Sequence, residues 1–139
     1  MVLIFIIIIL ALYIIAIIST YQNMFAFEKT TKILYLILGF IIVSIITVII
    51  SKIGLPNSAD NKEILNVVKR TIQIIFIPLN ALIILPFMAN NISKYKVKAI
   101  SEEKLKKRIL IMSIVYIIFI IFEKNYIKDF HIGVLANMK

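Results

Sequence analysis

The chain has 139 residues, of which 62% are hydrophobic, and isoleucine alone occupies 36 positions. Soluble domains are only about 45–50% apolar, and the 17% of charged residues could not cover such an apolar mass. The composition therefore excludes a soluble monomer and an intrinsically disordered chain. The absence of cysteine excludes a disulfide scaffold and thiol chemistry. We expect an all-α fold: a polytopic integral membrane protein with four transmembrane helices in a small bundle.

Four apolar runs predict four spans within a single transmembrane domain of residues 1–139. The expected spans are residues 2–20, 33–51, 71–90 and 107–124. The first run lacks the basic start and the cleavage site of a signal peptide, so we expect it to be retained. The apolar part of the fourth run, 109–122, is 14 residues long. At 1.5 Å per residue it measures roughly 21 Å, which is short for a bilayer core of about 30 Å.

The start of the fourth helix has a recognisable sequence pattern. Ser101 is followed by Glu102 and Glu103, and acidic residues in a first turn interact favourably with the helix dipole. Lys106 and Lys107 follow four residues after these two acids, a spacing and order that favour ion pairs on one helix face. The pattern predicts a helix that begins at Ser101.

The connection 91–108 is strongly basic. It holds seven cations, namely Lys94, Lys96, Lys98, Lys104, Lys106, Lys107 and Arg108. With Lys29 and Lys32, one side of the membrane would carry nine Lys and Arg residues and the other seven. By the positive-inside rule we expect this connection in the cytoplasm, both termini outside, and an interfacial tail at 125–139. The seven cations are expected to contact anionic lipids of the bilayer, not nucleic acid.

The third span is the most polar of the four. Gln73 and Asn80 lie seven residues apart, and Pro78 and Pro86 each remove a backbone donor beside Asn80. A carboxamide at mid-depth beside freed carbonyls is suited to binding an ion or a polar solute. The alternative is that these carboxamides only bond to neighbouring helices. The candidate polar intramembrane site comprises Gln73, Asn80, Glu123, Ser44, Thr47 and Tyr116.

Glu123 permits two interpretations. Counted from Arg108 along a helix, it lies roughly 22 Å from the cytoplasmic interface, a few ångströms inside the outer edge. One interpretation is an outer-leaflet ion pair of Glu123 with Arg70 and Lys69. The other is an unpaired intramembrane carboxylate that takes part in proton coupling.

No sequence motif indicates catalysis. The chain has no G-x-S-x-G, no H-E-x-x-H and no P-loop, and a single histidine without cysteine makes a metal site improbable. We therefore expect no enzyme, no cofactor and no metal. The first functional hypothesis is a non-catalytic subunit or accessory factor of a membrane assembly, in contact with a partner membrane protein or as a homo-oligomer. The alternative is a small oligomeric transporter or channel built on the third helix, and a holin-like pore former ranks third. The abundance of Ile, Lys and Asn is typical of AT-rich coding, so the expected location is a bacterial plasma membrane.

Overall fold

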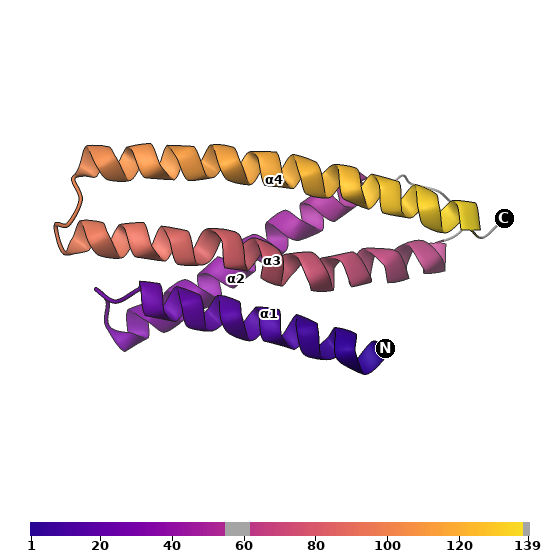
Figure 1. Ribbon diagram of the computed structural model, residues 1–139, viewed down its shortest axis with the longest axis horizontal. Coiled ribbons are helices and arrows are strands. Elements are labelled where there is room, and N and C mark those ends of the chain that lie inside the picture. The colour runs from indigo at the N-terminus through magenta and orange to yellow at the C-terminus, as the bar shows by residue number, and fades with distance from the viewer. Residues whose placement is uncertain (55–61, 138–139) are drawn as a thin grey trace.

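The computed structural model describes the backbone of residues 1–54 and 62–137, and the side chains of residues 1–52, 63 and 66–129. Every element in this part is an α-helix, as Figure 1 shows. The helices are α1 (Val2–Asn23), α2 (Lys29–Gly54), α3 (Lys62–Lys96) and α4 (Glu102–Asn137). The expected all-α class is thus confirmed.

Three helices in the described part of the chain are long and apolar enough to cross a membrane. They are Val2–Asn23, Lys29–Lys52 and Asn66–Lys96. The fourth helix does not meet the same criterion of length and composition. After its charged first turns, the exposed residues of α4 from Leu110 to Phe122 are apolar except for Ser113. The exposed residues that follow include Lys124, Asn125 and Lys128.

Helix α3 is the centre of the arrangement, because it packs against each of the other three helices. In Figure 1 α1 and α4 lie on opposite sides of α3, and α2 crosses obliquely behind. Helices α1 and α3 run in one direction, and α4 runs antiparallel to α3. The α1–α2 and α3–α4 connections therefore lie at one end of the bundle, and α1 begins and α4 ends at the other.

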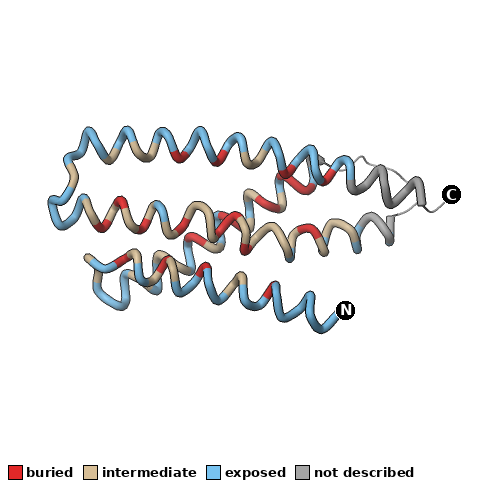
Figure 2. The backbone as a smooth tube through the Cα atoms, in the orientation of Figure 1, coloured by how far each residue is buried: buried red, intermediate tan, exposed pale blue. Residues whose placement is uncertain are grey.

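The core consists of two small apolar clusters. One is formed by Ile50, Ile72 and Ile127, and the other includes Val43, Ala81 and Leu85 together with Ala16. Figure 2 shows that buried positions concentrate where α1, α2 and α4 face α3, whereas much of the outer surface is exposed. That exposed surface is rich in Ile and Leu, above all on α1 and α2. An exposed surface that is as apolar as the core is expected when the surrounding solvent is lipid.

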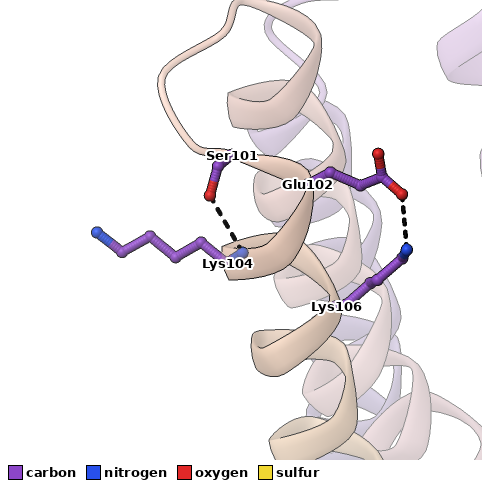
Figure 3. Close-up of polar contacts among 4 residues, drawn as sticks. All are labelled: Ser101, Glu102, Lys104 and Lys106. Atoms are coloured by element: carbon purple, nitrogen blue, oxygen red, sulfur yellow. Dashed lines mark hydrogen bonds and ion pairs between the residues drawn. The ribbon is translucent and has the colours of Figure 1, made fainter.

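The start of α4 confirms the pattern in the sequence. The Ser101 Oγ accepts a hydrogen bond from the Lys104 backbone N–H at 3.3 Å, and Glu102 pairs with Lys106 at 2.7 Å (Figure 3). No other ion pair occurs among the side chains that the structure describes, so Glu103 and Lys107 do not pair. The helix continues to Asn137, so most of the expected interfacial tail, 125–137, is a direct extension of α4.

The end of α3 is a Schellman-type turn without glycine. The Ala99 N–H donates to the Lys94 carbonyl at 2.8 Å, and the Lys98 N–H donates to the Tyr95 carbonyl at 2.9 Å. Lys98 has a φ of 58°, in the left-handed region that an L side chain disfavours. This turn and the short segment 97–101 bring α4 back alongside α3.

Candidate functional site

One polar contact joins three helices in the interior of the bundle. The Asn80 Nδ2 of α3 donates hydrogen bonds to the Thr47 Oγ1 of α2 and to the Glu123 Oε2 of α4, each at 3.2 Å. All three side chains are buried, with 0% of Asn80 and 1% of Glu123 exposed. Along α3, Asn80 lies between the two apolar clusters, so this polar group has apolar neighbours on both sides.

The antiparallel register of α3 and α4 sets this contact. The short connection at 97–101 starts the pairing, and the Arg108 Nη1 donates to the Asn91 Oδ1 at 3.2 Å. Further along, the rings of Phe76 and Tyr126 meet edge to face with centroids 6.3 Å apart. Glu123 therefore faces Asn80. Asn80 itself lies one residue from the midpoint of the candidate span Asn66–Lys96.

The structure places Glu123 differently from the expected outer-leaflet ion pair. Its carboxylate contacts Asn80, and neither Arg70 nor Lys69 has an ion-pair partner among the described side chains. The physical reason is the register: Arg70 lies ten residues beyond Asn80 along α3, or roughly 15 Å at 1.5 Å per residue. Glu123 therefore lies opposite the middle of α3 and not opposite the segment that holds Arg70.

Among the described side chains, three buried polar atoms have no hydrogen-bond partner. They are the Asn80 Oδ1, the Glu123 Oε1 and the Tyr116 Oη. Buried polar groups are normally satisfied, so oxygens of this kind are suited to accept a proton, a cation or a water. Two of the three atoms are acceptors only, the carboxamide and carboxylate oxygens, whereas the hydroxyl can also donate. Such oxygen atoms are typical ligands of protons and hard cations.

The structure brings some of the other expected site residues together and separates others. The Gln73 Nε2 donates to the Ser51 Oγ at 3.0 Å, a second polar link between α2 and α3. Thr47 also donates to the carbonyl of Val43 at 2.8 Å, the local bond that is common for membrane hydroxyls. Ser44 is half-buried and takes no part in these contacts. Ser51, the partner of Gln73, was not among the expected site residues, although it lies four residues after Thr47 on α2.

The two prolines lie inside α3, which stays helical through both. Pro78 is buried close to the Asn80 contact, and Pro86 lies beside Leu85. The Leu85 carbonyl accepts a hydrogen bond from the Tyr35 Oη of α2 at 3.2 Å. Each proline deprives the carbonyl four residues earlier of its helical donor. The contact region thus contains additional backbone acceptors.

A second polar group lies at the end of the bundle that holds the basic connection. The Asn90 Nδ2 donates to the Asn23 Oδ1 at 2.6 Å, and the Ser93 Oγ donates to the Asn23 carbonyl at 2.8 Å. These bonds attach the end of α1 to α3. The sequence analysis did not identify these residues; their only signal is that polar residues flank the apolar runs.

The seven cations of the basic connection are not equivalent. Lys94 and Arg108 are half-buried, and the other five are exposed. The half-buried pair faces the group formed by Asn23, Asn90 and Asn91, where a cavity opens. No family model matches this chain, and comparison with curated proteins and with solved structures gives no match.

Proposed function

We propose that the chain is a four-span integral membrane protein, with α4 crossing the bilayer beside α3. The contact of Glu123 with the middle of α3 supports this placement, because it aligns the two helices over most of their length. The short apolar face of α4 would be accommodated by local thinning and by extension of Lys124 and Lys128 toward the interface. The basic connection supports a plasma-membrane orientation with both termini outside.

We further propose a non-catalytic transport function: the protein is a small transporter or channel whose working site is the Asn80–Glu123 contact. The observation that carries this proposal is a buried carboxylate that bonds to a carboxamide and, among the described side chains, pairs with no cation. An ionised carboxylate at mid-depth is costly unless a positive charge compensates it. A small cation, either a proton or a monovalent metal ion, would supply that charge.

The geometry indicates how such a site would work. Asn80 holds one carboxylate oxygen of Glu123, and among the described side chains the other carboxylate oxygen, the Asn80 Oδ1 and the Tyr116 hydroxyl have no hydrogen-bond partner. A cation bound there would meet oxygens from α3 and α4 at once, so it would hold the two helices together. Its release would leave the carboxylate uncompensated and favour separation of the helices. A path across the membrane would need more than one copy, since Asn80, Thr47 and Glu123 are buried where α2, α3 and α4 meet.

The test is cation flux in liposomes that contain only the purified protein. We expect a sodium, potassium or proton gradient to drive flux with the native chain, and Glu123→Gln to abolish it without loss of folded protein. Glu103→Gln is the matched control, because this exposed glutamate lies on the same helix far from the contact. Absence of flux under all three gradients, or equal flux in Glu123→Gln, would contradict the proposal.

A second candidate function is the subunit or accessory role. It is favoured by an apolar groove of about 360 Å³ that opens between α2 and α3. Leu38, Ile42 and Met88 line it, and Gly39 has no side chain there. A groove of this kind suits the ridge of a helix from a partner membrane protein.

Crosslinking separates the two candidates. A photoreactive residue at Ile42, which is exposed beside the groove, would capture whatever packs there in cells. Crosslinks to a different membrane protein would support the subunit role. Crosslinks only between copies of this chain would support the oligomeric transporter, and crosslinks to lipid alone would count against both forms of assembly at this face.

A further inference from the structure

The end of the bundle near residues 97–101 contains a second, chemically different cavity. It measures about 380 Å³, within the ~300–1,000 Å³ range of small-molecule sites. It lies between the end of α1, the last turns of α3 and the start of α4. Its polar lining includes Asn90, Asn91, Lys94 and Arg108, and its apolar lining is Pro86 and Phe87.

The cavity carries an uncompensated positive charge. Neither Lys94 nor Arg108 contacts a carboxylate among the described side chains, where Glu102 pairs only with Lys106. The Asn91 Oδ1 accepts a bond from one Arg108 nitrogen and so orients the guanidinium. Most of the other Arg108 donors stay available in a fixed fork, the geometry that recognises phosphate oxygens.

The position of the cavity favours the phosphate of a lipid headgroup over a free phosphate ion. Arg108 directly precedes the apolar residues 109–122, and Lys94 lies near the end of the candidate span Asn66–Lys96. Both cations therefore lie at headgroup level, where anionic lipids are concentrated. Pro86 and Phe87 extend the cavity toward the apolar middle of α3. A free anion would leave this apolar wall uncovered, whereas a lipid would cover it.

We propose that this cavity binds one anionic phospholipid, with its phosphate on Arg108 and Lys94 and its glycerol region against Pro86 and Phe87. The hydrogen bond between Asn90 and Asn23 holds α1 against α3 at the rim. The site differs from the general attraction of the exposed lysines because it takes a single molecule and is selective for headgroup charge. It is independent of the cation site at Glu123, so Glu123→Gln should bind lipid normally.

The experiment is native mass spectrometry of the delipidated full chain, titrated with phosphatidylglycerol or with phosphatidylcholine. We expect one tightly retained phosphatidylglycerol and a preference over phosphatidylcholine of about tenfold, as expected for charge-assisted bonds of this kind. Arg108→Gln should remove that preference. Lys107→Gln, which removes the same charge from the neighbouring exposed position, should keep it.

Two further arms make the outcomes decisive. Arg108→Lys, which keeps the charge but not the fork, should bind with intermediate strength, and the melting temperature of each lipid-free variant shows whether it is folded. Millimolar inorganic phosphate should not displace the lipid; displacement would assign the cavity to a free anion and overturn the proposal. Equal losses in Arg108→Gln and Lys107→Gln would reduce the effect to net charge and would also overturn it.

Discussion

The Asn80 carboxamide and the Glu123 carboxylate, 43 residues apart in sequence, are joined by a hydrogen bond of 3.2 Å in the interior of the bundle. The same Asn80 nitrogen also donates to Thr47, so a single amide group connects α2, α3 and α4. In an apolar environment no water is available to take over the hydrogen bond if either side chain is lost. The bond therefore contributes both to helix association and to the electrostatics of the proposed cation site.

The bond predicts energetic coupling between Asn80 and Glu123. We expect Asn80→Leu and Glu123→Leu each to destabilise the protein, and the double mutant to lose less than the sum of the two. Hydrogen bonds between membrane helices average about 0.6 kcal/mol and reach about 1.7 kcal/mol. We expect a coupling near 1.5 kcal/mol because the acceptor is a carboxylate. Unfolding in mild detergent with added denaturant measures it.

Arg70 provides the matched comparison for this cycle. Because Glu123 contacts Asn80 and lies well away from Arg70 along α3, Arg70→Gln and Glu123→Leu should be additive within about 0.3–0.5 kcal/mol. A coupling of Glu123 with Arg70 larger than its coupling with Asn80 would restore the outer-leaflet ion pair. Two additive cycles would mean that Glu123 has neither partner in the membrane.

Thr47 should matter more than another buried threonine of the same kind. Its Oγ1 accepts the Asn80 bond, whereas the hydroxyl of Thr20 donates only to the carbonyl of Ala16 within α1. We expect Thr47→Val to cost about 1 kcal/mol because it leaves a buried amide donor with one partner fewer. Thr20→Val should cost clearly less. Thr47→Ser, which keeps the hydroxyl, should be more stable than Thr47→Val. Equal losses at the two threonines would contradict the role of Thr47.

The orientation of the chain can be tested with single cysteines, because the native sequence has none. Ala99→Cys and Lys128→Cys place a thiol at exposed positions on the α3–α4 connection and on the far part of α4. With both termini outside, an impermeant thiol reagent should label Lys128→Cys in intact cells and Ala99→Cys only after lysis. The opposite labelling pattern would reverse the proposed topology.

The turn at Lys98 predicts a stabilising substitution. An L side chain in the left-handed region costs roughly 1–2 kcal/mol, and glycine avoids this cost. Part of the gain is lost to the greater freedom of glycine in the unfolded chain, so we expect Lys98→Gly to stabilise by about 0.5–1 kcal/mol. Lys96→Gly, inside the last turn of α3, should destabilise instead. A loss of stability in Lys98→Gly would show that its side chain makes a contact of its own.

The four helices of the described residues, and the place of Asn80 near the middle of the third apolar helix, could be predicted from the sequence, because long Ile-rich runs have few alternatives to helices in lipid. The start of α4 was equally readable from Ser101 and its acidic first turn. The partner of Glu123 could not be predicted from the sequence, since it depends on the register of two helices and on the face that each presents to the other. The bond between Asn90 and Asn23 joins residues 67 positions apart, and no local pattern indicates such a pair.

The short apolar run of α4 has a consequence for biosynthesis. A helix whose apolar stretch is only 14 residues long, includes Ser113 and is followed directly by the Glu123 carboxylate partitions poorly into a bilayer when it leaves the ribosome alone. Helix α3 is already complete at that moment, and only residues 97–101 separate it from α4. On the proposed four-span topology, α4 would therefore insert as a hairpin with α3, in which Asn80 bonds to Glu123 during insertion. A nascent chain arrested before residue 123 would present an incompletely paired amide to the lipid, which makes it a natural substrate for membrane quality control.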